Sequence, residues 1–318
     1  MPIQSENIAF AAEEMVTCAE CARKNPPTRL NCVYCGAEFE ISEVDGGKIK
    51  PTLRRLEAWE KGFNLIVSPA DPAGRAAIAR DFKLEPEAVG RLFESGKRLP
   101  IARVESDKEC RVLRDILAKH GVESMIVSDE ELAADTPPRR LRGIEFGESG
   151  ARFVLFNDES TIEIEPDELE VIVTGAVFQK AIEATEKRKK GQTRMINATE
   201  TASDEPVLDI YIHGEALGFR ITTAGFDFSC LGAEKGILAR ENLKRLTVRL
   251  NEFAPKAKLV DDYLKLRDVL GEVWEVDVRK DSHGMKRSSF GKFDLMTVSS
   301  SSNLRQFNKY SRLQRCLI

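Results

Sequence analysis

The chain has 318 residues, of which 42% are hydrophobic and 31% are charged, a composition typical of a globular protein with two or three domains. The longest apolar runs, such as Leu65-Ile66-Val67, have the length of strands, so we predict no membrane-spanning helix. The first residues include Glu6, Glu13 and Glu14 where a signal peptide would have a basic start and an apolar run, and we therefore expect a cytoplasmic protein. A net charge of −4 argues against a uniformly basic coat for nucleic acid.

Two closely spaced pairs of cysteines lie near the start of the chain and form the pattern C-x2-C-x10-C-x2-C. Each pair can turn two sulfur atoms toward one ion, and four thiolates complete the tetrahedron that structural Zn²⁺ prefers. Gly36, which follows the second pair, suits the left-handed turn of such a site. We therefore predict a zinc ribbon over residues 14–45, in which every metal position is filled and none is left for water or substrate. The predicted ligands are Cys18, Cys21, Cys32 and Cys35.

A redox pair and ordinary buried thiols are the other interpretations of these cysteines. A redox C-x-x-C pair normally stands alone at the start of a helix, whereas this chain has two pairs with Pro26-Pro27 between them. A module of about 30 residues is too short for a self-sufficient apolar core, so we expect the ribbon to be disordered without its metal. Cys110, Cys230 and Cys316 are expected to be free thiols.

A compact α/β domain is predicted over residues 60–128. Apolar periodicity, a Ser cap and Gly stops indicate the element order βααβαβ. The predicted elements are a strand at Phe63–Val67, helices over 72–82 and 85–94, a strand at Leu99–Val104, a helix between Ser106 and His120-Gly121, and a strand at Val122–Val127.

This order and its apolar pattern, over residues 63–128, resemble the C-terminal domain of the bacterial ribosomal stalk protein and the related ClpS-type adaptors. The resemblance implies a domain that docks another protein and catalyses no reaction. The lysines with which the stalk domain meets its partners are largely missing from the corresponding helices here. Those helices instead carry Arg75, Arg80 and Arg91 among Asp81, Glu85 and Glu87, so we do not expect the same partner.

A polar stretch over residues 129–140, with Pro137-Pro138, predicts a domain boundary before an α+β domain over residues 139–318. Alternating apolar and polar residues between Gly143 and Glu165 predict an antiparallel meander. We expect an amphipathic helix over Ala176–Lys190 and a flexible loop near 191–206, where Thr, Asn, Ser and Asp dominate.

The rest of this domain is predicted to contain two further strands and three helices, with the serine tract Ser299–Ser302 in a loop. The strands are Val207–Ile212 and Leu217–Thr222, and the helices are Ala239–Phe253, Leu259–Val273 and a short final helix that packs back through Phe307, Tyr310 and Leu313. The predicted fold class of the chain is therefore α+β: a small zinc ribbon, a βααβαβ domain, and a larger domain of antiparallel sheet and helices.

Catalytic signatures are missing from the sequence. It contains no Gly-x-Ser-x-Gly elbow, Walker-type loop, Gly-x-Gly-x-x-Gly after a strand, or His-Glu-x-x-His, and we predict no catalytic residue and no enzyme. His120 suits the dipole at a helix end, and His213 suits a paired position in a sheet. His283 is the one histidine expected to be exposed; it suits an ordinary loop better than a phosphate site.

Acidic residues and one further thiol are weaker candidates. Asp261-Asp262 and Asp227 together suggest a cation site, but adjacent acids in the first turn of a helix usually complement its dipole. Cys230 lies in apolar company with no nearby histidine to lower its pKa, which favours an inert buried thiol over a nucleophile.

Basic residues with interleaved aromatics indicate two stretches for nucleic-acid contact, one in and after the ribbon and one near the end of the chain. The ribbon stretch contains Arg23, Lys24, Arg29, Tyr34, Lys48, Lys50, Arg54 and Arg55, diluted by five acids. The candidate contacts in the final stretch are Arg279, Lys280, Lys286, Arg287, Arg305, Lys309 and Arg312. The other interpretation of this final stretch is a solvated face whose aromatics pack inward.

Our leading hypothesis is a non-enzymatic adaptor or regulatory protein that binds a protein partner and contains structural Zn²⁺. The alternative is a nucleic-acid-binding protein that uses the ribbon and the basic final stretch. A third hypothesis is an enzyme with an unfamiliar site around Arg220, Asp227 or His283. We expect no membrane partner, and no small-molecule substrate is evident.

Overall fold

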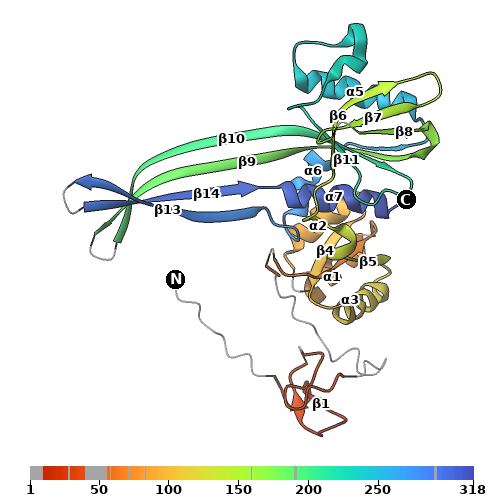
Figure 1. The fold of residues 1–318 in the computed structure, drawn as a ribbon. Helices are drawn as coiled ribbons and strands as arrows, with labels where there is room; N and C mark the ends of the chain where they lie inside the picture. The colour runs from red at the N-terminus through yellow and green to blue at the C-terminus, as the bar shows by residue number, and fades with distance from the viewer. Residues whose placement is uncertain are drawn as a thin grey trace. The chain divides into compact units, whose positions relative to one another are not determined.

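The computed structural model describes residues 10–27, 29–39, 56–57, 59–70, 72–82, 84–158, 160–189, 192–289 and 292–318, with the backbone alone at 72–73, 185–189, 192–197, 282–289 and 292–296. The chain divides into two compact units, Met1–Asp129 and Glu130–Ile318 (Figure 1). The fold is of the α+β class: a two-stranded sheet, a three-stranded sheet with helices, and a nine-stranded, mostly antiparallel sheet with helices.

The first unit begins with a small cysteine-rich module. Strand β1 (Val16–Thr17) pairs antiparallel with β2 (Lys24–Asn25). The buried core of this module consists of Val16, Phe39 and two of the cysteines. So few apolar side chains cannot offset the chain entropy of folding, which is the physical reason to expect a metal at its centre. Residues 40–45 of the predicted ribbon lie outside the described residues.

The second part of the first unit has the element order βααβαβ, as predicted. The elements are β3 (Phe63–Val67), α1 (Pro72–Phe82), α2 (Pro86–Glu94), β4 (Leu99–Val104), α3 (Asp107–Lys119) and β5 (Ser124–Ser128). Strand β3 lies in the middle of the sheet and pairs antiparallel with both neighbours. Its Leu65, Ile66 and Val67 are at most 1% exposed, which makes this strand the centre of the domain core. The predicted cap and stop of α3 are confirmed, since Ser106 Oγ accepts a hydrogen bond from Glu109 N at 3.2 Å and Gly121 has φ +72°.

A buried polar cluster ties the end of this domain to its beginning. Asp129 Oδ2 accepts hydrogen bonds from Gly62 N at 3.0 Å and Arg103 Nε at 2.8 Å, and Asp129 Oδ1 accepts one from Asn64 Nδ2 at 3.0 Å. Arg103 also donates to the backbone oxygen of Glu60. The side chains of Arg103 and Asp129 are only 8% and 10% exposed, so each neutralises a charge that would otherwise be buried alone.

The second unit is built around a sheet with the strand order β13-β14-β9-β10-β11-β6-β7-β8, and the short β12 runs parallel to β9. The predicted meander is confirmed by the antiparallel pairing of β6, β7 and β8. The strands are β6 (Arg139–Phe146), β7 (Ala151–Leu155), β8 (Thr161–Ile164), β9 (Leu169–Lys189), β10 (Gln192–Ile212), β11 (Phe219–Thr222), β12 (Lys258–Val260), β13 (Asp277–Ser289) and β14 (Lys292–Ser302). The helices are α4 (Asp129–Leu132), which crosses the unit boundary, α5 (Ala239–Phe253), α6 (Tyr263–Leu270), α7 (Leu304–Cys316) and two 3-10 helices, Pro166–Glu168 and Phe228–Glu234.

Alternate residues of the central strands serve two different cores. Leu208 and Ile210 of β10 join the apolar cluster that also contains Leu246 of α5. Asp209 and Tyr211, the residues between and after them, face the hydroxyl of Ser311 on α7. The period of two along a strand therefore places α5 over one face of the sheet and α7 over the other.

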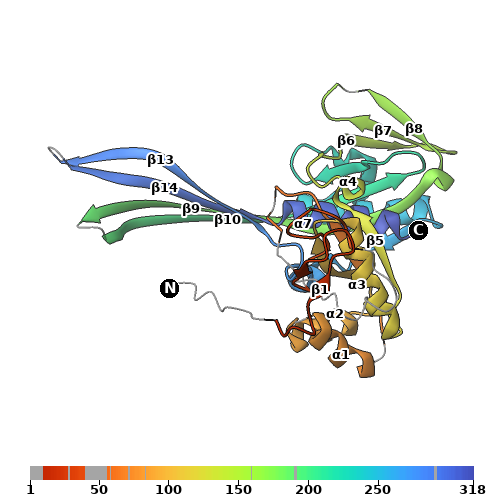
Figure 2. The same ribbon diagram turned by 90° about the horizontal axis from the view of Figure 1, so that it is seen from below.

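Two long hairpins leave this core together and form an arm (Figure 1). Strands β9 and β10 pair along 21 residues each, and β14 continues the sheet by pairing with β9 from Gln179 to Glu186. At about 3.3 Å per residue, a strand of this length extends roughly 70 Å. Figure 2 shows the β9–β10 and β13–β14 hairpins projecting in the same direction. We define the arm as residues 176–206 and 277–302.

Four predictions for this unit were wrong. The predicted helix Ala176–Lys190 belongs to β9, the predicted flexible loop near 191–206 is largely β10, and the serine tract Ser299–Ser302 is part of β14. The predicted helix Leu259–Val273 is shorter, because Leu259 lies in β12 and α6 begins at Tyr263. The arm could not be recognised locally, because residues 198–205 of β10, which pair with residues 177–184 of β9, are all exposed and give no apolar alternation.

The predicted final helix is confirmed as α7, and its burial is more complete than apolar spacing implied. Every residue from Gln306 to Gln314 is buried, including polar ones. Gln306 Nε2 donates to Trp274 O at 2.8 Å, and Asn303, which precedes the helix, donates to Ala176 O at 3.0 Å. Hydrogen bonds to neighbouring backbone are what make such burial of polar groups tolerable.

The two tryptophans of the chain lie in different units and different environments. Trp59, in the first unit, is 79% exposed. Trp274, in the second unit, is 3% exposed, and the ammonium group of Lys309 lies 5.8 Å from its ring centre.

Candidate functional sites

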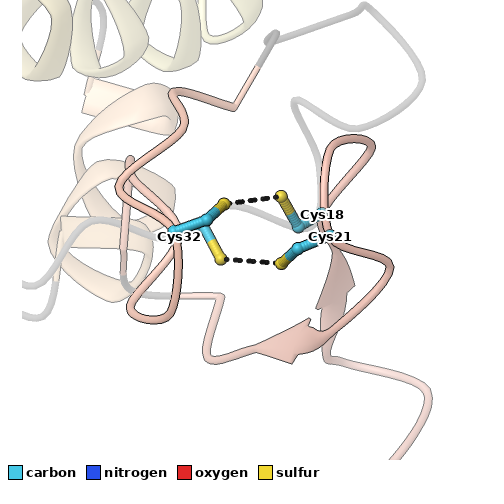
Figure 3. A group of neighbouring side chains, drawn as sticks. Cys18, Cys21 and Cys32 are labelled. Carbon is cyan, nitrogen blue, oxygen red and sulfur yellow. Dashed lines mark hydrogen bonds between the residues drawn. The ribbon is translucent and has the colours of Figure 1, made fainter.

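The four predicted cysteine ligands come together in the first unit. Their sulfur atoms all lie within 4.8 Å of one another, with Cys18 Sγ 3.7 Å from Cys35 Sγ and Cys21 Sγ 3.5 Å from Cys32 Sγ. Figure 3 shows the sulfur atoms of Cys18, Cys21 and Cys32 turned toward a common centre. These separations are far longer than the ~2.05 Å of a disulfide, and all four cysteines are free thiols.

The cluster fits a tetrahedral metal ion. Zn–S bonds of about 2.3 Å in a tetrahedron place neighbouring sulfurs roughly 3.8 Å apart, close to the 3.5 Å and 3.7 Å between the sulfurs of the two contacting pairs. Four cysteine ligands can therefore hold a metal ion such as zinc. The softness of thiolate ligands favours zinc over the hard cations calcium and magnesium.

Backbone geometry forms the two knuckles that carry the thiols. Cys18 O accepts a hydrogen bond from Ala22 N at 2.9 Å, and Cys32 O accepts one from Gly36 N at 2.9 Å. The residue after each pair is left-handed, with φ +56° at Ala22 and +77° at Gly36. The prediction of a left-handed turn at Gly36 is thus confirmed, and Ala22 occupies the equivalent position of the first knuckle with an ordinary L side chain.

Two thiols of the cluster differ in how readily they ionise. Burial opposes ionisation of Cys32, but hydrogen bonds from the backbone of Cys35 and Tyr34 and from neighbouring thiols lower its pKa to about 6. A backbone hydrogen bond from Ala37 favours the Cys35 thiolate, yet burial and the other three thiols raise its pKa to about 12. Ionisation of one thiol in the cluster therefore disfavours ionisation of another unless a cation compensates the negative charge.

Three of the seven predicted nucleic-acid contacts in the final stretch are occupied by internal contacts. Arg312 is 3% exposed and donates to Leu132 O at 3.0 Å and to the backbone oxygens of Ala133 and Thr136. Lys309 is 7% exposed beside Trp274, and Arg305 pairs with Asp135. We remove these three from the candidate surface, because their charges hold α7 in place.

The other four predicted contacts lie on β13. Arg279 and Lys280 are exposed near the base of the arm, and the strand register places Lys286 and Arg287 opposite Asp294 and Phe293 near its end. Arg279 also borders an open groove of about 510 Å³ across the arm, lined further by the hydroxyl-bearing Thr201, Ser203, Ser300 and Ser302.

Sequence reasoning missed a second basic segment that the fold brings to the same end of the arm. Residues 187–194 carry five Lys or Arg and no acid, and residues 283–292 carry three and no acid. Pairing of β14 with β9 extends as far as Leu295 and Glu186, so both segments lie at the same end of the arm, where the two hairpins diverge (Figure 1). We call this the basic arm end, defined by Lys187, Arg188, Lys189, Arg194, Lys286, Arg287 and Lys292. The run of basic residues at 187–190 indicated a basic surface in the sequence, but it was assigned to the end of the predicted helix Ala176–Lys190.

The histidine candidates do not form a reactive group among the described side chains. His120 Nε2 lies 2.6 Å from Asp81 Oδ2, and hydrogen bonding to this imidazole holds the pKa of Asp81 below its usual range. His213 lies 3.0 Å from Glu170 Oε1 with a side chain that is 83% exposed. The side chain of His283 lies outside the described residues.

The remaining candidates also have structural contacts. Arg220 forms a bidentate pair with Asp209 at 2.6 Å and 2.7 Å, and both are buried. Asp227 caps the 3-10 helix Phe228–Glu234 by accepting from Ser229 N at 3.0 Å. Burial raises the pKa of the Cys230 thiol, consistent with an inert thiol, and Asp262 occupies the N-cap position of α6.

Comparison of the chain with protein-family models, with curated proteins and with solved structures found no match. The likeness of residues 63–128 to stalk-type docking domains therefore stays a prediction. Among the described residues, no helix is long and apolar enough to cross a membrane.

Proposed function

We propose that this chain is a non-catalytic nucleic-acid-binding protein whose basic arm end contacts the phosphate backbone. The observation that supports it is the register of β9, β10, β13 and β14, which places seven Lys and Arg residues from segments about 100 residues apart at one end of a projecting sheet. At about 3.3 Å per residue, the basic positions of each hairpin fall within roughly 10 Å along its strands.

Such a concentration of like charge is unfavourable for the isolated fold. Arg194 is directly opposite Lys187 in the register, and like charges opposite one another destabilise a sheet, whereas Lys286 is opposite Asp294. A bound polyanion would remove this repulsion and release its own condensed counterions, and both effects favour association.

The density of charge favours nucleic acid over other anions. Duplex DNA carries one negative charge per about 1.7 Å of its axis, which matches several closely spaced cations on one surface. The hydroxyl-lined groove beside Arg279 adds polar groups of the type that commonly contact phosphate and sugar oxygens. The partner class we propose is therefore nucleic acid bound through its backbone, without sequence preference at the arm.

In this proposal the cysteine cluster holds structural zinc. Four thiolates complete the coordination of the ion and leave no position for water or substrate. The metal would then supply folding free energy to a module with a very small apolar core.

The test is fluorescence anisotropy of labelled single-stranded RNA, single-stranded DNA and duplex DNA across a salt series. We compare the zinc-loaded chain with the triple variant Lys187→Gln, Arg188→Gln, Lys189→Gln. Loss of three phosphate contacts should reduce the slope of log K against log salt by up to about 3 and weaken binding to all three ligands.

A matched control carries Lys244→Gln, Lys256→Gln and Lys258→Gln, three exposed lysines of the same unit outside the arm. This variant has the same net charge as the arm variant and should bind like the original chain. Equal affinities of the arm variant, the control and the original chain for every ligand would refute the proposal.

A second candidate function, a protein-binding adaptor, is favoured by the βααβαβ domain with its central β3. Deleting residues 63–128 should then abolish recovery of a partner in a pull-down while leaving the nucleic-acid affinity of the arm unchanged. Recovery of the same partner by the deletion variant would contradict this function.

A further inference from the structure

An exposed apolar tip projects from the second cysteine knuckle. Val33 and Tyr34 occupy the two positions between the ligands Cys32 and Cys35, and they are 54% and 56% exposed. Both side chains are therefore accessible to a ligand at the tip of the knuckle.

The backbone under these side chains is held in place. Val33 N donates a hydrogen bond to Asn25 Oδ1 at 2.9 Å, and Tyr34 N donates to Cys32 Sγ at 3.5 Å. Asn25 is fully buried and donates in turn to Arg23 O at 2.9 Å. The tip is therefore fixed by the cysteine cluster and by β2, and loss of the metal would release it.

Arg23 orients the tyrosine ring. Its guanidinium carbon lies 4.8 Å from the centre of the Tyr34 ring, within the range of a cation–π contact. Arg23 and the next residue, Lys24, are both exposed. An aromatic ring held beside an exposed cation combines the two features with which proteins bind single strands: stacking of a base and attraction of the adjacent phosphate.

We propose that Tyr34, supported by Arg23 and the metal-bound knuckle, is a stacking platform for an unpaired nucleobase. This inference rests on the proposed function, since the arm supplies the phosphate contacts and the ribbon supplies preference for single strands. The described ribbon, residues 10–39 without residue 28, contains three Lys or Arg and four Asp or Glu, so its contribution is stacking rather than bulk charge. Bases in a duplex are stacked on both faces and offer no free face to Tyr34.

The experiment compares a labelled single-stranded RNA with a duplex of equal length, using the zinc-loaded full chain. Replacing a stacking aromatic typically weakens binding about 5- to 100-fold per base, so Tyr34→Ala should lose at least about fivefold affinity for the single strand. Its affinity for the duplex should be unchanged. Tyr34→Phe retains the ring and should bind within about twofold of the original chain.

Two controls separate stacking from damage to the fold. Trp59→Ala removes another exposed aromatic of the same unit and should change neither affinity. Metal content of each variant is measured with a colorimetric chelator, and Tyr34→Ala should keep its zinc because its ring is exposed. In addition, a 2-aminopurine base in the single strand should be quenched by the original chain and by Tyr34→Phe, and not by Tyr34→Ala.

The outcomes for the ribbon and the arm are distinguishable. Two results with zinc-loaded Tyr34→Ala would refute the stacking platform: unchanged affinity for the single strand, or an equal loss of affinity for the single strand and the duplex. Either result refutes it even if the arm variant loses binding. If the arm variant binds every ligand as the original chain does, the proposed function fails regardless of the Tyr34 result.

Discussion

At the scale of single residues, the two knuckles show how the same backbone turn is made by different side chains. The turn needs a left-handed residue, which costs an L residue about 1–2 kcal/mol relative to the right-handed region. Gly36 avoids this cost, whereas Ala22 adopts φ +56° and bears it. The cysteine spacing and Gly36 made the second knuckle predictable; no feature of the sequence indicated that Ala22 repeats its geometry.

We predict opposite effects from exchanging these residues. A Cβ on residue 36 would meet no atom within 4 Å, so Gly36→Ala tests backbone conformation alone. It should weaken zinc affinity by about 1 kcal/mol, roughly fivefold, because folding and metal binding are linked. Ala22→Gly should tighten affinity by a smaller amount, since the flexibility of glycine in the unfolded chain offsets part of the gain. Competition with a chelator of known affinity measures both changes, and a tighter Gly36→Ala site would contradict the argument.

The buried pair Arg103 and Asp129 allows a second prediction at this scale. Asp129→Leu leaves the guanidinium of Arg103 buried without its carboxylate and should lower the free energy of unfolding by about 3–5 kcal/mol. The double variant Arg103→Leu, Asp129→Leu removes both charges and should be less destabilised than the single variant. Urea denaturation followed by circular dichroism measures these differences; a double variant that is at least as destabilised as Asp129→Leu would contradict the argument.

At the scale of elements, prediction succeeded where caps and an apolar face mark an element in the sequence, and it failed in the arm, where no apolar pattern does. The α3 helix has a Ser106 cap, an apolar face and a Gly121 stop, and all three were recognised. In the arm, both faces of β10 between Ala198 and Glu205 are exposed, so the sequence has no apolar alternation to reveal a strand. Cross-strand hydrogen bonds to β9 determine its conformation instead.

Contact between α7 and β9 supports a prediction about packing. A Cβ on Gly175 would lie 2.3 Å from Phe307 Cε2, so Gly175→Ala forces the helix away from the strand. We expect a loss of about 1–3 kcal/mol in stability, as for other overpacked cores. Gly143→Ala, in β6, meets no atom within 4 Å and should be neutral or slightly stabilising. Thermal unfolding of the two variants side by side tests this, and similar melting temperatures would exclude the close approach as a determinant.

At the scale of the whole molecule, the cysteine cluster and the arm belong to different units. The cysteine cluster lies in Met1–Asp129, whereas the arm belongs entirely to Glu130–Ile318. The spacing of the cysteines was enough to predict that the four thiols come together in one cluster. Composition and charge could not place the basic arm end, because its two segments come to the same end of the arm only after β14 has paired with β9.

This division predicts that metal loss has a local effect. Cys35→Ser removes an exposed thiol of the cluster and should abolish stoichiometric zinc, whereas Cys316→Ser removes an exposed thiol outside it and should retain one zinc per chain. By hydrogen exchange, peptides from residues 10–39 of Cys35→Ser should lose protection because the ribbon folds with its metal. Peptides from residues 130–318 should exchange as in the original chain, and a general loss of protection there would contradict the independence of the units.

The placement of the two indole rings gives the unlabelled chain a pair of optical reporters. Trp59 is in water in the first unit, so its emission is red-shifted and open to quenching by dissolved iodide, while Trp274 is enclosed in the second unit and shielded from the quencher. The emission quenched by iodide comes from Trp59 and reports on the first unit. The emission that remains comes from Trp274 and reports on the second unit. Replacing Trp59 by phenylalanine would leave a single reporter beneath α7, sensitive to the detachment of that helix from the sheet.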